Sequence, residues 1–185
     1  MISFYNGKGH EQFIDNDGDY IVVNSKFIST NGQVQKHCNS QIEPLYKDDI
    51  LMVMSDLPNG KALAKCYLVE QNDLYTLNQR ICAFRIKDKS IVNVEYLYYI
   101  LDRNKQLLRY DNGVDQTNLR KDDILNIHIP VLNINKQAEI VSALRKFDAY
   151  CNDLTQGLPA EIELRQRQYE YYRDKLLTFK NINEE

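Results

Sequence analysis

The pattern of apolar and polar residues changes in character near residue 134. Before this point, short runs rich in β-branched and aromatic residues alternate with polar segments containing Asn, Asp, Gly or Pro, as strands and turns do. After it, apolar residues recur every three or four positions, which is the spacing of one helix face. The pattern therefore predicts a mixed α+β domain over residues 1–134 and a helical region over residues 135–185.

Four apolar runs in the first part are predicted to be strands: Tyr20–Val23, Ile50–Met54, Ala62–Val69 and Ile81–Ile86. Two turn signals lie between them, Asn31-Gly32 and Pro58-Asn59-Gly60. Gly, and Asn to a lesser degree, tolerates positive φ, which is why these pairs mark turns.

One helix interrupts the strands. Asn93 is its predicted N-cap, and the apolar residues that follow fall close to one helix face as far as Tyr110: Val94, Leu97, Tyr98, Leu101 and Leu108. Beyond it, the composition predicts a polar loop over Asp111–Leu119, one helical turn over Lys121–Leu125 and a final strand over Asn126–Val131, ended by Pro130.

The helical region is predicted to contain two helices, at about 136–156 and 159–179. Gly157 and Pro159 separate them, because Gly favours a helix end and Pro a helix start. Each helix carries a seam of coiled-coil spacing. The first seam is Ile140, Leu144, Phe147, Cys151 and Leu154, and the second is Ile162, Arg165, Tyr169, Tyr172, Leu176 and Phe179.

This tail has two interpretations, a helical hairpin folded on its own domain or a dimerisation arm. Heptad spacing on two successive helices favours the arm, as do the aromatic residues Tyr169 and Tyr172, which require a partner surface. We therefore expect a long C-terminal helical arm that forms an antiparallel coiled coil with a partner.

Composition restricts the function. The net charge of −3 lacks the basic excess of most nucleic-acid-binding proteins, so DNA binding requires a local basic surface or a partner that contacts the phosphates. No run is long and apolar enough for a membrane span or a signal peptide, and we expect a cytoplasmic protein. The cysteines form no CxxC pair, so we expect reduced, mostly buried thiols: Cys38, Cys66, Cys82 and Cys151.

No catalytic or metal-binding constellation is recognisable. A phosphate-binding loop and the Pro-Pro motif of adenine methyltransferases are absent from the sequence. The glycine-rich segment Gly7–His10 follows no convincing strand, and His10, His37 and His128 lack metal-ligand spacing. The acidic pairs Asp48-Asp49 and Asp122-Asp123 are interpreted as turn or cap residues rather than nuclease carboxylates.

Three segments resemble the specificity subunits of type I restriction-modification systems. Gly157–Phe179, GLPAEIELRQRQYEYYRDKLLTF, resembles the helical region of that family over a long and distinctive stretch. The segment Gly113–Leu144 resembles the end of a target recognition domain, and Leu77–Ile81, LNQRI, is similar to a recurrent mid-domain segment. The resemblance is strong in the C-terminal half and loose in the N-terminal half.

The resemblance implies a non-catalytic subunit whose recognition domain reads one half of a split DNA target, while a long helix sets the gap to the second half. In that family, two methyltransferase subunits carrying S-adenosylmethionine dock on the specificity subunit and methylate adenine at N6, and motor-nuclease subunits join for cleavage. No cofactor is expected on the specificity subunit itself.

A complete subunit of the family has two recognition domains and two helical regions, whereas this sequence carries one of each. It therefore resembles a half-length form, either natural or from a truncated gene. We expect two copies to pair through the 159–179 helices and to read a palindromic split site in double-stranded DNA.

Residue chemistry restricts the DNA contacts. Base edges are read by Arg, Asn and Gln, and phosphates by Lys, Arg and backbone amides. The candidates in polar loops are Asn6, Lys8, His10, Lys36, His37, Asn59, Lys61, Asn78, Gln79, Arg80, Asn112, Gln116, Asn118 and Arg120. The stretches 78–80 and 113–120 are the preferred ones, although each also has a structural interpretation.

Two other functional classes stay open at this point. One is a recognition module of a different restriction system, and the other is an interaction or anti-restriction module that binds methyltransferase subunits without reading DNA.

Overall fold

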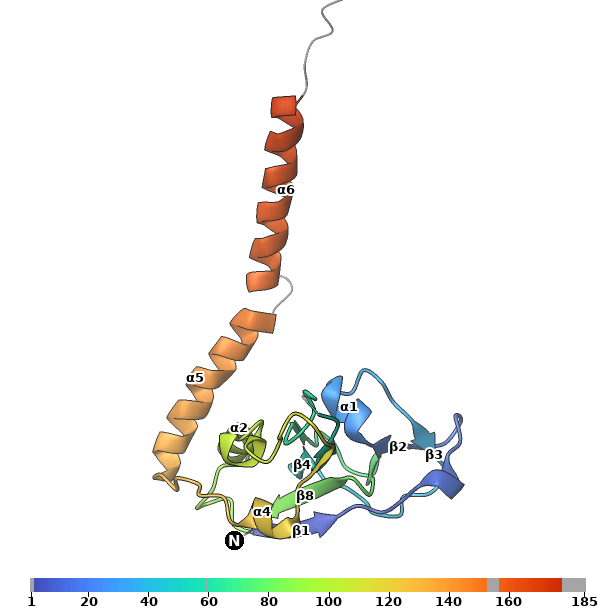
Figure 1. Ribbon diagram of the computed structural model, residues 1–185. Coiled ribbons are helices and arrows are strands. Elements are labelled where there is room, and N and C mark those ends of the chain that lie inside the picture. Colours follow the sequence, from blue (N-terminus) through green and yellow to red (C-terminus); the bar gives the residue numbers. More distant parts are fainter. Residues whose placement is uncertain (1, 59, 153–156, 178–185) are drawn as a thin grey trace, which may run out of the picture. The chain divides into compact units, whose positions relative to one another are not determined.

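The structure is a computed structural model that describes residues 2–58, 60–152 and 157–177 (Figure 1). The chain divides into two compact units, residues 1–138 and 139–185. In the described part of the chain, every strand belongs to the first unit, which also contains the short helices. The mixed α+β class predicted for this part is confirmed.

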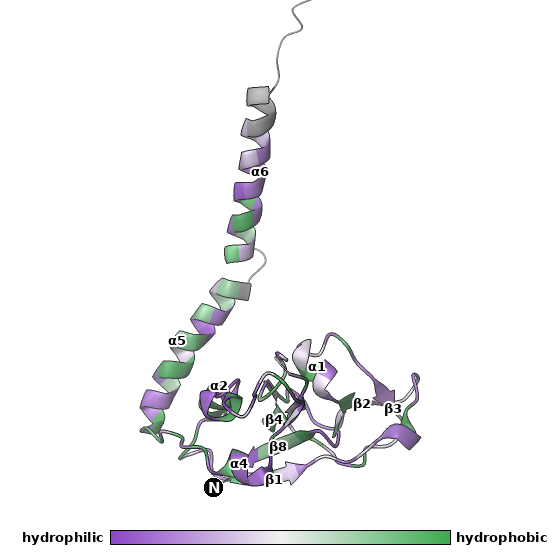
Figure 2. Cartoon of the chain, viewed as in Figure 1, coloured by the Kyte–Doolittle hydropathy of each residue, from purple (hydrophilic) through white to green (hydrophobic). Residues whose placement is uncertain are grey.

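The main sheet of the first unit has four antiparallel strands in the order β1-β8-β4-β6 (Figure 1). Their bounds are Ile2–Asn6 for β1, Ile81–Ile86 for β8, Ile50–Val53 for β4 and Cys66–Leu68 for β6. The two central strands are almost fully buried, and β8 is hydrophobic along most of its length (Figure 2).

Two hydrophobic cores cover opposite faces of this sheet. Ile50 and Met52 belong to one core, whereas Leu51 and Val53 belong to the other. Successive side chains of a strand point to opposite faces, so alternate residues of β4 enter different cores. This explains why β4 is a continuous apolar run rather than an alternating one.

Helices complete the first core and a smaller sheet completes the second. The first core receives side chains from α2, Val94–Leu101, α3, Lys105–Leu108, and α4, Lys121–Leu125. The second contains α1, Ser25–Ser29, and the sheet β3-β2-β7, made of His37–Cys38, Tyr20–Val23 and Tyr75–Leu77. A third sheet pairs β5, Ser55–Asp56, with β9, Thr117–Asn118, and the 3-10 helix η1 spans Glu11–Phe13.

Most of the predicted strands are confirmed, at Tyr20–Val23, Ile50–Val53 and Ile81–Ile86. The prediction of a strand throughout Ala62–Val69 is wrong, because only Cys66–Leu68 is a strand. Before it the chain turns at Ala64, whose φ is 55°, and the Lys65 N–H donates to the Ala62 carbonyl at 2.9 Å. Strands β1, β3, β5 and β7 were not predicted, and β9 lies inside the predicted loop.

The predicted helix from residue 94 to Tyr110 is broken into α2 and α3. The Asp102 carboxylate accepts the Cys66 N–H at 2.7 Å, and the Arg103 N–H donates to the Ala64 carbonyl at 2.8 Å. Arg103 takes a φ of 51°, and Asn104 then caps α3. Contacts with the turn before β6 thus end the helix, although the predicted N-cap Asn93 is confirmed, accepting the Tyr96 N–H.

The predicted strand Asn126–Val131 is wrong. This segment is irregular, because its backbone groups bond to side chains instead of a neighbouring strand. The Gln106 amide accepts the His128 N–H at 3.0 Å and donates to the His128 carbonyl at 2.9 Å. The Tyr96 hydroxyl donates to the Pro130 carbonyl at 2.8 Å. His128 consequently lies outside any strand.

Gln137, in the first turn of α5, is fully buried within the first unit. Its amide oxygen accepts the Asn93 N–H at 2.8 Å, and its amide nitrogen donates to the carbonyls of Ile91 and Leu132 at 2.9 and 2.7 Å. One side chain thereby joins the start of α2 to the segment that leads into α5, Ile134–Asn152.

The second unit consists of the rest of α5 and of α6, Leu158–Leu177. Two i,i+4 ion pairs support α6, Glu161–Arg165 at 3.8 Å and Glu163–Arg167. Of the predicted seam, Ile162, Tyr169 and Tyr172 are more than half exposed. Leu176 lies within α6, whereas Leu154 and Phe179, with the predicted helix ends at 156 and 179, lie outside the described residues.

Cys38, Cys66 and Cys82 are buried free thiols and Cys151 is exposed, which confirms the expectation of mostly buried thiols. Among the residues that the structure describes, no helix has the length and apolar character needed to cross a membrane.

Candidate nucleic-acid interface

Four polar segments that are distant in sequence meet along one edge of the first unit. Lys8 donates its backbone N–H to the Leu77 carbonyl at 3.1 Å, Met54 donates to Arg80 at 3.0 Å, and Leu119 donates to Met54 at 2.7 Å. These bonds connect neighbouring segments in a row. We call this row the polar rim, and it consists of residues 6–8, 78–80, 54–56 and 116–120.

Gly7 makes the first of these approaches possible. A Cβ at this position would lie 2.0 Å from the Asn78 carbonyl oxygen, where no side chain fits. The Gly7 N–H also donates to the Ile81 carbonyl at 3.1 Å. The segment Gly7–His10 therefore does follow a strand, β1, contrary to the sequence-based interpretation, and its glycine allows two backbones to touch.

The pairing of β5 with β9 brings the 116–120 segment to the rim. Ser55 lies opposite Asn118, and the Gln116 side-chain amide donates to the Ser55 hydroxyl at 2.7 Å. Ser55 and Thr117 are buried, whereas Gln116 and Asn118 are exposed. The candidate Asn118 thus lies on a paired strand, and Gln116, directly before that strand, is held by its bond to Ser55.

Asp56 holds the turn that carries Lys61. Its carboxylate accepts the N–H groups of Leu57, Ala62 and Leu63 at 2.9, 2.7 and 3.0 Å. The exposed Lys61 therefore lies in a turn whose two ends are fixed beside the rim. Asn59 lies outside the described residues.

The rim is a mixed polar surface rather than a basic one. Its exposed residues are Asn6, Lys8, Gln79, Arg80, Gln116, Asn118 and Arg120. Lys8 forms an ion pair with Glu43 at 2.5 Å, and the Asp123 carboxylate accepts the Arg120 N–H at 2.8 Å. Amide and guanidinium groups of this kind match the donor and acceptor pattern of base edges. Of the acidic pairs, Asp48-Asp49 lies at the turn before β4 and Asp122-Asp123 in the first turn of α4, as predicted, and Asp49 also forms an ion pair with Arg85 at 2.7 Å.

Two of the predicted DNA contacts form hydrogen bonds within the chain. His10 is only 1% exposed; its Nδ1 lies 2.7 Å from the Lys8 carbonyl and its Nε2 2.8 Å from the Thr76 hydroxyl. A buried imidazole cannot reach DNA, so His10 is removed from the candidates. Asn112 accepts the N–H groups of Val114 and Asp115 within its own turn.

Lys36 and His37 lie away from the rim strands. His37 belongs to β3, which β2 separates from β7, and its Nδ1 lies 3.1 Å from the Gly18 carbonyl. Lys36 is exposed and its carbonyl accepts the Val22 N–H at 2.8 Å.

Sequence reasoning missed Ser55, Asp56 and Gln137, since their roles depend on partners far along the chain. The Gln116–Ser55 contact, for example, joins residues 61 positions apart. In the part of the chain that the structure describes, no group of three or more His, Cys, Asp or Glu is arranged to hold a metal ion.

Known proteins similar to this chain were compared by sequence and by structure. The family model described as "Type I restriction modification DNA specificity domain" matches residues 8–164. The specificity subunit of a type I restriction enzyme from Escherichia coli is 44% identical over 107 residues, which cover 56% of this chain and 26% of that protein. A putative type I specificity subunit from Haemophilus influenzae is 35% identical over 92 residues, covering 50% of this chain and 23% of that protein.

Two solved structures share the fold. A type I restriction-modification S subunit from M. genitalium matches with a TM-score of 0.61 and 20% identity, covering 95% of this chain and 43% of that chain. A structure from a study of type I complex assembly matches with a TM-score of 0.68 and 16% identity, covering 91% and 41%. The chain thus spans less than half the length of these relatives. Because the family model covers most of the sequence, the chain belongs to the type I restriction-modification DNA specificity domain family.

Proposed function

We propose that this chain is a non-catalytic DNA-recognition component of a type I restriction-modification methyltransferase, and that the polar rim reads one half of a bipartite target. The observation that carries the proposal is the meeting of segments 6–8, 78–80 and 116–120, which were separately predicted from residue chemistry to contact DNA. Its relatives are named specificity subunits, which supports the same assignment.

Within the rim, different residues suit different parts of DNA. Arg80, Gln79 and Asn118 carry groups that form bidentate bonds with guanine or adenine in the major groove. Lys61 and Lys8 suit phosphates, and the engagement of Lys8 by Glu43 limits the charge available for them. Since the chain is acidic overall, methyltransferase subunits supply much of the grip on the phosphates in this proposal.

The methyltransferase subunits would bind S-adenosylmethionine and methylate adenine at N6, and a motor-nuclease subunit would join for cleavage. The chain itself would position these subunits on a chosen sequence.

Two copies pair through α6 in this proposal and so place two rims on a palindromic split site. The support is the exposed seam of α6, where Ile162 and Tyr169 are 68% and 61% exposed. Side chains of this size are seldom left fully in water in a repeating stripe.

Light scattering coupled to size exclusion tests the pairing. We expect a dimer at tens of micromolar, and Tyr172→Asp should weaken it by burying a charge in the seam. Tyr171→Asp is the matched control, since Tyr171 is also more than half exposed but lies on a different helix face. A monomeric wild-type chain, or equal effects of the two variants, would contradict the proposed seam.

The recognition function is tested by mapping methylated adenines in host DNA with the gene present, deleted and restored. A bipartite motif should disappear on deletion and return on restoration. If the chain binds a methyltransferase subunit yet no motif depends on it, the interaction-module alternative holds; if the motif depends on it without a type I methyltransferase, a different restriction system is indicated.

A further inference from the structure

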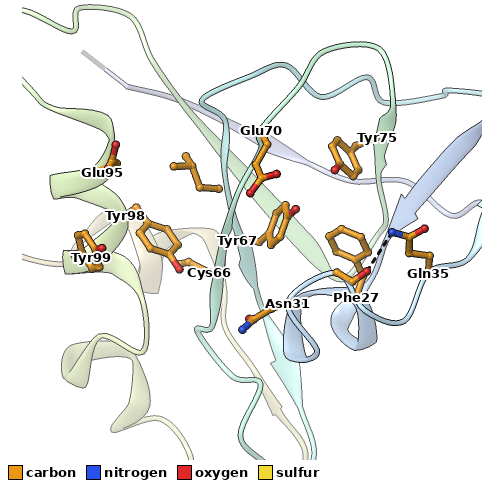
Figure 3. A pocket seen from close by; sticks show the side chains of 12 residues that line it. Phe27, Asn31, Gln35, Cys66, Tyr67, Glu70, Tyr75, Glu95, Tyr98 and Tyr99 are labelled. Carbon is orange, nitrogen blue, oxygen red and sulfur yellow. Dashed lines mark hydrogen bonds between the residues drawn. The ribbon is translucent and has the colours of Figure 1, made fainter. Parts of the chain in front are cut away.

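A pocket of about 510 Å³ lies between the turn after α1, strand β6 and helix α2, all within the first unit. Figure 3 shows aromatic rings around it, from elements that are far apart in sequence. Tyr67, Tyr98 and Tyr99 are half-buried and contribute to its lining, whereas Phe27 and Tyr75 are buried behind them. The volume falls within the range of small-molecule sites.

The aromatic lining is a packed cluster, not a set of mobile side chains. The ring centroids of Phe27 and Tyr67 lie 4.9 Å apart in an edge-to-face arrangement, and those of Tyr67 and Tyr75 lie 6.3 Å apart. Tyr98 and Tyr99 form a second edge-to-face pair at 5.4 Å. The rings around the pocket therefore pack against one another without a ligand.

The charged residues of the pocket are acidic. Glu70 and Glu95 are part of its lining, while none of the described lining residues is Lys, Arg or His. In Figure 3 the Glu70 carboxylate lies beside the Tyr67 hydroxyl. Burial, then the hydrogen bond with Tyr75, and then the nearby charges including Glu70 raise the pKa of Tyr67, so its phenol stays neutral.

We propose that this pocket binds an organic cation, an alkylguanidinium or alkylammonium group. Such a group is attracted by the faces of aromatic rings and by carboxylates at the same time. Asn31 and Gln35, on the turn after α1, add amide groups to the lining. A phosphate would be repelled by the same carboxylates, so this pocket differs in chemistry from the polar rim, and the proposal does not rest on the proposed function of the rim.

The bound cation can be a free small molecule or the Arg side chain of a protein, because the aromatic rings and carboxylates of the pocket would attract either one. The test uses amide chemical shifts of the isotope-labelled full chain, titrated with butylguanidinium and with butylurea, a neutral molecule of nearly the same shape. Butylguanidinium should shift the amides of Asn31, Gly32 and Leu68, and butylurea should not. Equal shifts with both molecules, or none with either, would overturn the proposal.

A pair of capped tripeptides with Arg or its neutral analogue citrulline in the centre separates the two sources. Shifts of the same amides with the Arg peptide and not with the citrulline peptide indicate a protein side chain as ligand, whereas binding of butylguanidinium but not of the Arg peptide indicates a free small-molecule cation.

Glu70→Gln removes the negative charge of the pocket lining at this position. Because Glu70 is exposed and Gln has nearly the same side-chain shape, we expect the fold to stay unchanged. We expect butylguanidinium to bind about threefold to fivefold more weakly, as loss of a partly exposed charge pair implies. Asp73→Asn is the matched control, since it removes a carboxylate from the same loop but not from the pocket lining. Equal weakening by both variants would show that only net charge matters and would refute a specific site.

Discussion

The close approach of the backbones at Gly7 gives a direct test of how the polar rim is built. In Gly7→Ala, the new Cβ would lie 2.0 Å from the Asn78 carbonyl oxygen, so the two backbones must separate by roughly 1.4 Å to reach ordinary contact. Gly7 and Lys8 each donate a backbone hydrogen bond across this junction at 3.1 Å. A separation of that size takes both bonds beyond hydrogen-bonding distance.

Each lost bond costs about 1 kcal/mol, and the remaining strain adds to it, so Gly7→Ala should lower the free energy of unfolding by roughly 2–4 kcal/mol. A loss of about 2 kcal/mol corresponds to a fall in Tm of roughly 4–8 °C for a chain of this size. Urea denaturation monitored by circular dichroism measures the change in the free energy of unfolding, and thermal denaturation measures the change in Tm.

Gly9→Ala is the matched control two residues further on. Its Cβ would meet the end of the flexible Glu11 side chain, at 2.6 Å, which can move away. We expect a change of less than about 0.5 kcal/mol for Gly9→Ala. If Gly7→Ala were as stable as Gly9→Ala, the inferred contact between segments 6–8 and 78–80 would be wrong, and the rim with it.

Three further outcomes follow from the structure. Lys61→Ala should reduce the salt dependence of DNA binding by about one counterion, whereas Arg80→Ala should relax sequence preference, at about 1–3 kcal/mol; fluorescence anisotropy with intact and altered target sequences at several salt concentrations measures both, and an unchanged slope for Lys61→Ala or an unchanged sequence preference for Arg80→Ala would argue against that contact. Gln137→Ala leaves three buried backbone groups without their partner and should cost roughly 2–4 kcal/mol in denaturant unfolding, whereas a neutral result would show that water replaces the amide. Burial raises the pKa of the Cys66 thiol, so a thiol reagent at pH 8 should modify the exposed Cys151 first, and Cys151→Ser should abolish the rapid phase; rapid labelling that persists would contradict the burial.

Local signals in the sequence determined the elements that short-range forces control. The runs at β4 and β8 combine apolar and β-branched residues that favour strands, and Asn93 accepts the Tyr96 N–H and so caps the helix that its own sequence predicts. The heptad spacing after residue 134 likewise predicted α5 and α6. The resemblance to type I specificity subunits also came from the sequence alone, because long segments of the sequence are distinctive of that family.

The sequence predicted candidate DNA-contacting residues, but it did not predict which of them lie together or which are buried. Asn78, Gln79 and Arg80 were chosen by side-chain chemistry, which says what a residue can bind but not which residues lie beside it. The imidazole of His10 could bind DNA if it were exposed, yet it is buried and lies within hydrogen-bond distance of the Lys8 carbonyl and the Thr76 hydroxyl. Burial of a polar residue depends on partners that the local pattern does not reveal.

Only the tertiary structure decided the interruptions and the assembly. The helix breaks at Arg103 because Asp102 accepts the Cys66 N–H, and residues 126–131 are irregular because Gln106 satisfies the His128 backbone. The rim forms because β5 pairs with β9 across a large sequence separation. Local propensity is worth fractions of a kcal/mol per residue, so long-range hydrogen bonds and burial override it wherever the two disagree.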